Sequence, residues 1–123
     1  MKQDTTHDQK FQTLLSSLNS SQLRAVKTIE GPVLVIAGPG TGKTQIIAAR
    51  IGYLLTTKDA HVAPGNILCL TYTDAASVNM RKRLINFIGP TAHRVGIFTF
   101  HAFCNDVIQS QDRKSTRLNS SHV

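Results

Sequence analysis

The feature that most constrains the fold of this chain is a glycine-rich stretch at 37–44, which reads AGPGTGKT. An apolar run, VLVI at 33–36, precedes it, and residues 45–51 have helical character. A strand, a glycine-rich turn and a helix that opens with Gly-Lys-Thr form the context of a phosphate-binding loop. The strict pattern begins with glycine, and Ala37 stands in that place. The stretch predicts that the chain binds a nucleoside triphosphate, and the alternative is a glycine-rich turn that binds nothing.

Each part of this loop has a predicted role. Backbone N–H groups at a helix N-terminus hold phosphate, and glycines let the backbone approach closely and adopt positive φ. Lys43 can reach the β- and γ-phosphates, and the Thr44 hydroxyl can ligate Mg²⁺. The predicted phosphate-binding residues are Ala37, Gly38, Pro39, Gly40, Thr41, Gly42, Lys43 and Thr44.

The rest of the pattern predicts an α/β fold. Continuous apolar runs at 67–71 and 95–100 predict two further strands, and strands that are apolar on both faces favour a parallel sheet with helices on each side. Helices are expected over 11–18, from a cap at Asn19 or Ser20 to about Ile29, over 43–55, from a cap at Asp74 to Phe87, and over 102–110.

Composition excludes several classes of protein. The 123 residues suffice for one domain, the hydrophobic fraction of 41% is that of a globular protein, and no apolar run approaches the roughly 18 residues of a membrane span. The N-terminus lacks the apolar core of a signal peptide. Cys69 and Cys104 lie in apolar segments without a CxxC partner, which predicts buried, reduced thiols in a cytoplasmic protein.

A net charge of +7 favours a polyanionic partner. The argument is weakened because part of this charge comes from the last eleven residues. Three of the fourteen basic residues lie in the last eleven residues, and without that tail eleven basic and seven acidic residues leave a charge of +4. Residues 75–105 hold four basic residues (Arg81, Lys82, Arg83 and Arg94) and no Asp or Glu. This segment is either a phosphate-facing surface or a solvated basic helix face.

Four segments together narrow the function. They are LNSSQ at 18–22, AGPGTGKT at 37–44, LTYTDAA at 70–76 and TFHAFC at 99–104. In this order and at these spacings they resemble the UvrD/Rep/PcrA-type superfamily 1 DNA helicases, over about residues 18–108. The resemblance implies a RecA-like P-loop NTPase fold, with ATP and Mg²⁺ as ligands and single-stranded or partly duplex DNA as partner.

The resemblance also implies roles for residues outside the loop. Gln22 matches a glutamine that reads the adenine edge, since a side-chain amide offers a donor and an acceptor. Arg50 matches an arginine near the adenine, and a simple surface arginine is the alternative.

DNA contact is implied at the second and third strand ends. Tyr72 matches an aromatic residue that stacks on bases, with a core aromatic as the alternative. Thr71 and Thr73 can donate to phosphates, and Thr99 and His101 match the next DNA-contacting block. A core-facing position is the alternative for His101.

The sequence departs from the family pattern in three ways. Asp74-Ala75 replaces the usual Asn-Lys, and Asn79 replaces a glutamate; both changes put phosphate contact at Asp74 in doubt unless the basic run at 81–83 compensates. The Asp-Glu pair that would hold Mg²⁺ and activate water is not in the sequence. Residues 113–123 are polar and resemble a translated sequencing adaptor, with a disordered tail as the alternative.

These observations predict an incomplete helicase domain over 18–112, an N-terminal extension over 1–17 and a non-native tail over 113–123. The leading hypothesis is an ATP-dependent, 3′-to-5′ DNA helicase with DNA-stimulated ATPase activity, of which this chain is an N-terminal fragment that is inactive alone. The alternatives are a non-catalytic ATP- or DNA-binding module and another P-loop enzyme, such as a small-molecule kinase. No oligomer is predicted.

Overall fold

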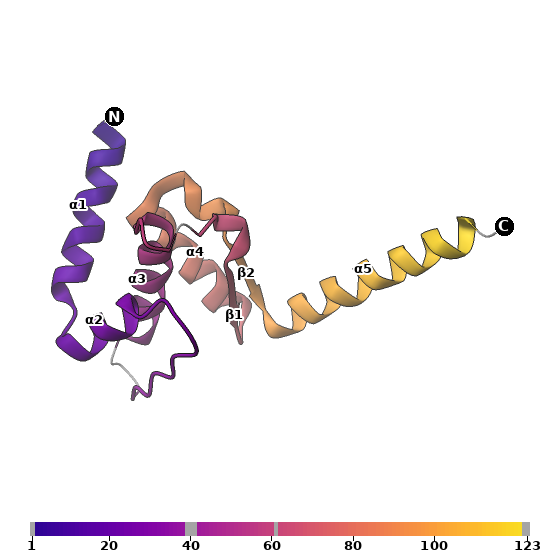
Figure 1. Cartoon of the computed structure of the whole chain (residues 1–123), viewed down its shortest axis with the longest axis horizontal. Helices are drawn as coiled ribbons and strands as arrows, with labels where there is room; N and C mark the ends of the chain where they lie inside the picture. The colour runs from indigo at the N-terminus through magenta and orange to yellow at the C-terminus, as the bar shows by residue number, and fades with distance from the viewer. Residues whose placement is uncertain (1, 39–41, 61, 122–123) are drawn as a thin grey trace.

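The computed structural model describes residues 2–38, 42–60 and 62–121. The chain runs through α1 (Lys2–Ser17), α2 (Ser20–Lys27), α3 (Lys43–Thr56), η1 (Pro64–Asn66), β1 (Leu68–Thr71), α4 (Asp74–Ile88), η2 (Gly89–Arg94), β2 (Gly96–Thr99) and α5 (Phe100–Ser121) (Figure 1). The mixed α/β class is therefore confirmed. Within the described ranges, no helix is long and apolar enough to cross a membrane.

The sheet is parallel, as predicted. β1 and β2 pair from Leu68↔Gly96 to Thr71↔Thr99, and α4 forms the crossover between them. One face of the sheet packs on α3 and α4 around a core that includes Cys69, Met80, Leu84, Val95 and Ile97. The other face leaves Leu68 46% and Phe98 37% exposed. The prediction of helices on both faces is wrong for this part of the chain, because α5 projects away from the body instead of lying along the strands (Figure 1).

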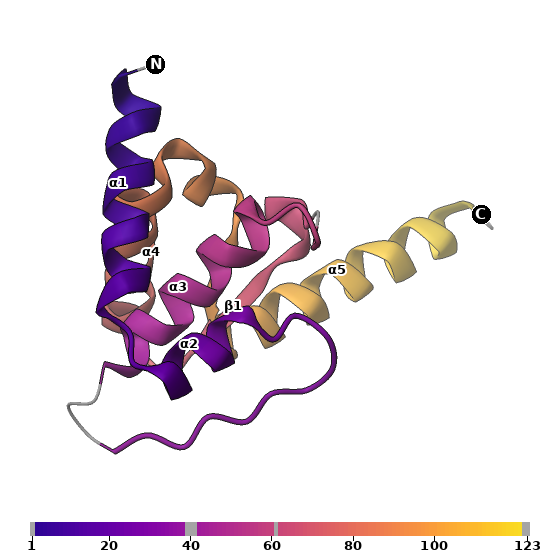
Figure 2. The same ribbon diagram turned by 60° about the vertical axis from the view of Figure 1, so that its left-hand side comes forward.

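The strand predicted over 33–36 is not formed. Residues 28–38, which follow α2, make a wide arc outside the helices (Figure 2) and have no regular secondary structure. Side chains alternate as in a strand: Val33 and Val35 line a cavity, while Leu34 and Ile36 are 86% and 91% exposed. A strand needs a hydrogen-bonded neighbour, and the sheet in the described part of the chain consists of β1 and β2 paired with each other. An apolar run alone is therefore not sufficient to form a strand.

A second core joins the N-terminal helices to α3. Phe11, Leu14 and Val26 pack with Ile46 and Ala49 of α3. α1 and α3 approach closely at Gly52: if any other residue stood there, its Cβ would lie 2.5 Å from Cε1 of Phe11. This cluster fixes α3, the helix that follows the glycine-rich loop, against α1 and α2.

Local capping signals explain most helix ends. Of the two predicted caps for α2, Asn19 is the one used, and it forms a capping box with Gln22. Gly89 ends α4 with φ +77°. The cap of α4 is Thr73, whose hydroxyl oxygen accepts from the Ala76 N–H at 3.0 Å. Asp74 is therefore the first helical residue and not the predicted cap. Both residue types favour caps, so the pattern alone did not separate them.

The last helix is longer than predicted. The sequence indicates a helix over 102–110, whereas α5 runs from Phe100 to Ser121 and includes most of the predicted tail. A helix satisfies its backbone hydrogen bonds internally, so it can continue without a hydrophobic period. Cys104 lies on α5 and is exposed, which corrects the prediction that both cysteines are buried; Cys69 is buried.

Candidate nucleotide and nucleic-acid sites

The N-terminus of α3 has the geometry of a phosphate-binding turn. Gly42 precedes the helix with φ +77° and ψ 32°, a left-handed conformation that favours glycine. Lys43 is the first helical residue and is exposed, and Thr44 is half-buried behind it. Gly42 offers no side-chain cap, so the first N–H groups of the helix have no capping partner from this residue. Pro39, Gly40 and Thr41 lie outside the described residues.

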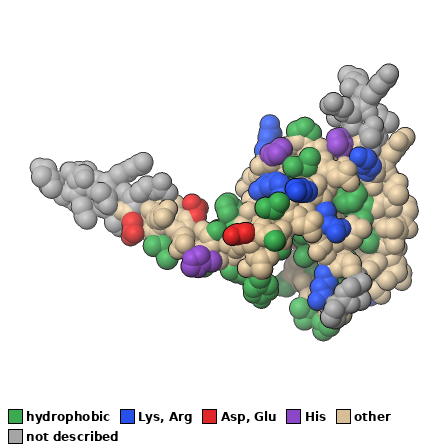
Figure 3. Space-filling model, turned by 180° about the vertical axis from the view of Figure 1, so that it is seen from behind, with side chains coloured by type: hydrophobic (Ala, Val, Ile, Leu, Met, Phe, Trp, Pro, Cys, Tyr) green, Lys and Arg blue, Asp and Glu red, His purple; other side chains and the backbone are tan. Residues whose placement is uncertain are grey.

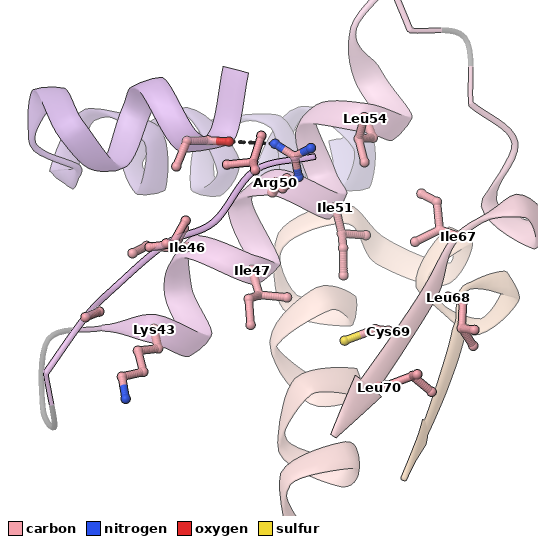
Figure 4. Close-up of a pocket in the computed structure, with 14 residues that line it drawn as sticks. Lys43, Ile46, Ile47, Arg50, Ile51, Leu54, Ile67, Leu68, Cys69 and Leu70 are labelled. Atoms are coloured by element: carbon pink, nitrogen blue, oxygen red, sulfur yellow. Dashed lines mark hydrogen bonds between the residues drawn. The ribbon is translucent and has the colours of Figure 1, made fainter. Parts of the chain in front are cut away.

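A cavity of about 480 Å³ lies beside this helix end. The segment at 33–37, one face of α3 and the strand β1 enclose it, and Ala37 forms part of its wall. Lys43 and Arg50 are the basic side chains among its described lining residues, which include no acid. Figure 4 shows the two cations at separate places along α3, with apolar side chains between them and β1. The cavity therefore combines apolar walls with positive charge.

Arg50 ties α2 to α3. Its Nη1 donates to the carbonyl oxygens of Ala25 at 2.6 Å and Thr28 at 2.5 Å, at the C-terminal end of α2. A cation is favourable there because the last carbonyls of a helix lack intrahelical partners. The predicted contact of Arg50 with adenine stays a prediction.

Gln22 is part of the capping box of α2. Its Oε1 accepts from the Asn19 N–H at 2.9 Å, and the Gln22 N–H donates to Oδ1 of Asn19 at 2.9 Å. The first bond orients the amide and uses one of the two lone pairs of Oε1, which leaves the other lone pair and the NH₂ group. Gln22 can therefore still offer a donor and an acceptor to a base.

The two predicted DNA-contacting segments meet at one edge of the sheet. Because Thr71 pairs with Thr99, the residues that follow β1 and β2 lie side by side. Tyr72 is 90% exposed, and its ring centroid lies 5.2 Å from that of Phe100 at an interplanar angle of 39°. His101 is also exposed. The alternatives that placed Tyr72 and His101 in the core are therefore wrong.

The three threonines at this edge are already hydrogen-bonded. Thr71 Oγ1 donates to the Thr73 carbonyl at 3.2 Å and lies 2.5 Å from Oγ of Ser77. The hydroxyl oxygens of Thr73 and Thr99 accept from the N–H groups of Ala76 and Ala102, each at 3.0 Å. Thr99 is buried, whereas Thr73 is exposed and keeps its own proton for an outside acceptor.

Comparison with known proteins supplies the family. The family model of the UvrD/REP helicase N-terminal domain matches residues 18–122. The chain belongs to the UvrD/REP helicase family. It is 46% identical over 96 residues to the ATP-dependent DNA helicase PcrA of Bacillus subtilis, and 42% identical over 96 residues to the PcrA proteins of Staphylococcus aureus and Staphylococcus epidermidis. These alignments cover 78% of this chain and 13% of each relative, so the chain spans about an eighth of the length of the curated relatives it matches.

Phe100 also lies at the edge of the sheet where β1 and β2 end, and the sequence did not single it out as a DNA-contacting residue. Its side chain is 44% exposed, and its ring lies beside that of Tyr72. The Thr71↔Thr99 register explains the pairing, and no local pattern reveals a register between distant strands.

Arg81, in the basic run of this UvrD/REP-type chain, bonds at the opposite end of β2 from this edge. Arg81 donates from Nη1 to the carbonyl oxygens of Ala92 and Val95, both at 2.7 Å, just before β2 begins. Arg83 is half-buried, and its Nε is buried without a partner. Burial raises the pKa of the Cys69 thiol, and the positive charge of Arg81 partly offsets that rise. Cys69 is therefore a buried core thiol whose thiolate form is disfavoured.

Metal ligands are sparse in the described part of this helicase domain. No group of three or more His, Cys, Asp or Glu side chains gathers there in a way that could hold a metal ion. Mg²⁺ is usually held by one or two carboxylates together with substrate phosphates.

Proposed function

We propose that this chain carries the nucleotide-binding end and part of the single-stranded DNA surface of an ATP-dependent DNA helicase that moves 3′-to-5′. The observation that carries the proposal is the start of α3, where Gly42 takes a left-handed conformation directly before Lys43 and Thr44. Helix dipole, uncapped N–H groups and a lysine together suit a triphosphate. The names of the relatives support ATP as the nucleotide and DNA as the partner.

The two proposed ligands would meet at the carboxyl end of β1. Lys43 and Leu70 line the same cavity, and Tyr72 follows Leu70 by two residues. A phosphate at Lys43 and a base on Tyr72 would therefore both lie near the carboxyl end of β1. This proximity supports a role in which the nucleotide state affects the DNA contact.

The chain alone should bind nucleotide without hydrolysing it. Phosphoryl transfer to water requires a group that orients the attacking water, in addition to the lysine and Mg²⁺ that neutralise the phosphates. None of the seven acidic residues is adjacent to another, so the sequence contains no Asp-Glu pair. When bound, Mg²⁺ would neutralise phosphate charge, with Thr44 as its protein hydroxyl.

The test uses the full-length protein that contains this chain. Lys43→Ala should lower DNA-stimulated phosphate release by at least about 10²–10³-fold, because it removes a charge that faces the transition state. Lys58→Ala is the matched control, since Lys58 is an exposed lysine outside the cavity. Equal activity of the two variants would contradict the nucleotide site. Binding of ATP without turnover would favour a non-catalytic module, and phosphoryl transfer to a small molecule would favour a kinase.

A further inference from the structure

Asp74 is an acidic residue at the edge where DNA should bind. It is exposed and is the first residue of α4, two positions after Tyr72. The turn that holds it is well fixed, because Thr73 bonds to the Ala76 N–H and the Thr73 carbonyl accepts both from the Ser77 N–H at 3.1 Å and from Thr71 Oγ1 at 3.2 Å. The backbone of Asp74 is therefore held in a defined position, two residues after the tyrosine.

The strand ends and helix starts at this edge carry no Lys or Arg that could neutralise this carboxylate. Residues 70–80 and 95–105 contain no Lys or Arg, so β1, the start of α4, β2 and the start of α5 carry none. Arg81 and Arg94 lie near the other end of β2: Arg81 bonds to the Val95 carbonyl, and Arg94 directly precedes Val95. Four residues of strand separate the two ends by roughly 13 Å. On the face shown in Figure 3, basic side chains spread over the globular body, whereas acidic ones lie on α5 and near its base.

The N-terminus of α4 would otherwise attract phosphate. Its first N–H groups and the helix dipole favour an anion, and Asp74 already supplies one. A phosphate group that approached the same end would meet a like charge. Beside it, however, the exposed Tyr72 ring and its partner Phe100 present an aromatic surface to any unpaired base.

Resting on the function proposed above, we propose that Asp74 determines the specificity of this edge for the bases of single-stranded DNA. Its carboxylate keeps phosphates away from the start of α4, so that the contact is made by stacking on the Tyr72–Phe100 pair. Duplex DNA presents its phosphates outward and keeps its bases stacked inside, so the same carboxylate disfavours it. The substrate class at this edge is therefore nucleic acid with unstacked bases.

The test compares four forms of the full chain: the unmodified chain, Asp74→Asn, Asp106→Asn and Tyr72→Ala. Asp106→Asn is the matched control, because Asp106 is also exposed and helical but lies two turns along α5. Fluorescence anisotropy measures binding to a labelled single strand of thymidines and to a blunt duplex of the same length, over a series of salt concentrations. A thermal melt accompanies each variant.

Asp74→Asn should tighten DNA binding by about threefold at low salt, as expected for one like charge removed near a phosphate in water. The gain should be larger for the duplex than for the single strand. The slope of log K against log salt should steepen by up to about 0.7, the value for one added phosphate contact on a single strand. The melting temperature should fall by about 1–4 °C because a favourable helix-terminal charge is lost. Asp106→Asn should show neither the affinity gain nor the change in slope.

Different outcomes separate the two proposals. If the unmodified chain does not bind DNA, or if Tyr72→Ala binds as tightly as the unmodified chain, the proposed DNA surface is wrong and the inference about Asp74 falls with it. If Tyr72→Ala weakens binding but Asp74→Asn has no effect, or has the same effect as Asp106→Asn, only the inference about Asp74 is overturned.

Discussion

Two parts of the molecule place an apolar run before a helix, and they differ in what surrounds that run. Residues 68–71 pair with β2 and lie against α3 and α4, whereas residues 33–36 have no strand partner in the described structure and expose Leu34 and Ile36. The helices that follow also begin differently: Thr73 caps α4 with its side chain, and α3 starts after Gly42 in a left-handed conformation. The first arrangement is stabilised by packing, and in the second the residue before the helix supplies no side-chain cap.

The difference teaches that helix starts depend on local sequence, whereas strands depend on neighbours. Both helices begin within one residue of the expected position, although one of them has no adjacent strand. Stability should therefore be concentrated around β1, and ligand binding around the start of α3.

The largest expected effect is on stability. Leu84 is fully buried in the core against which β1 packs, so Leu84→Ala should lower the free energy of unfolding by about 2–5 kcal/mol. Leu34→Ala should change it by less than about 0.5 kcal/mol, because Leu34 is 86% exposed. Urea unfolding of the full chain measures both. A cost at Leu34 as large as that at Leu84 would show that 33–36 is a packed strand.

A smaller effect concerns DNA binding at the end of β1. Tyr72→Ala should weaken binding to single-stranded DNA by about 1–3 kcal/mol, the contribution of one stacked base. The melting temperature should not change, since the side chain is exposed. Tyr72→Phe keeps the ring and should bind like the unmodified chain. Unchanged affinity together with a lower melting temperature in Tyr72→Ala would contradict a role in stacking.

The smallest effect concerns the cap of α4. Thr73→Ala removes the oxygen that accepts from the Ala76 N–H and should cost about 1 kcal/mol of stability. Thr73→Ser keeps that oxygen and should restore most of the loss. Thermal melts of both variants decide the matter, and a full loss in Thr73→Ser would mean that the threonine methyl group, and not the cap, is what stabilises the turn.

The parts of the fold that the sequence predicted are those with local signals. The period of three to four residues placed the end of the first helix, but not its start, because α1 begins at Lys2 and not near Phe11. The cap at Asn19 placed the start of α2, and the continuous apolar runs placed β1 and β2. The strand at 33–36 and the cover of the second sheet face failed because each depends on segments far away in the chain or absent from the described structure.

In the candidate site, too, the residues with local signals could be predicted, and those that depend on long-range contacts could not. Lys43 and Thr44 could be placed at the start of a helix because the Gly-Lys-Thr spacing is local. The exposure of Tyr72 and its contact with Phe100 could not be deduced, because they depend on the register between β1 and β2 and on the direction of α5. The hydrogen bonds of Arg50 to the end of α2 could not be deduced either, because they span sequence separations of 25 residues (to Ala25) and 22 residues (to Thr28).

The central claim is that the start of α3 binds a nucleotide but lacks the partner needed to hydrolyse it. The most direct measurement is phosphate release by the full 123-residue chain, with and without single-stranded DNA, alongside binding of a fluorescent ATP analogue. The account predicts weak binding that Lys43→Ala abolishes and Lys58→Ala preserves, with no phosphate release above the buffer blank. Phosphate release that disappears in Lys43→Ala would contradict it, and the chain would then be a complete small ATPase.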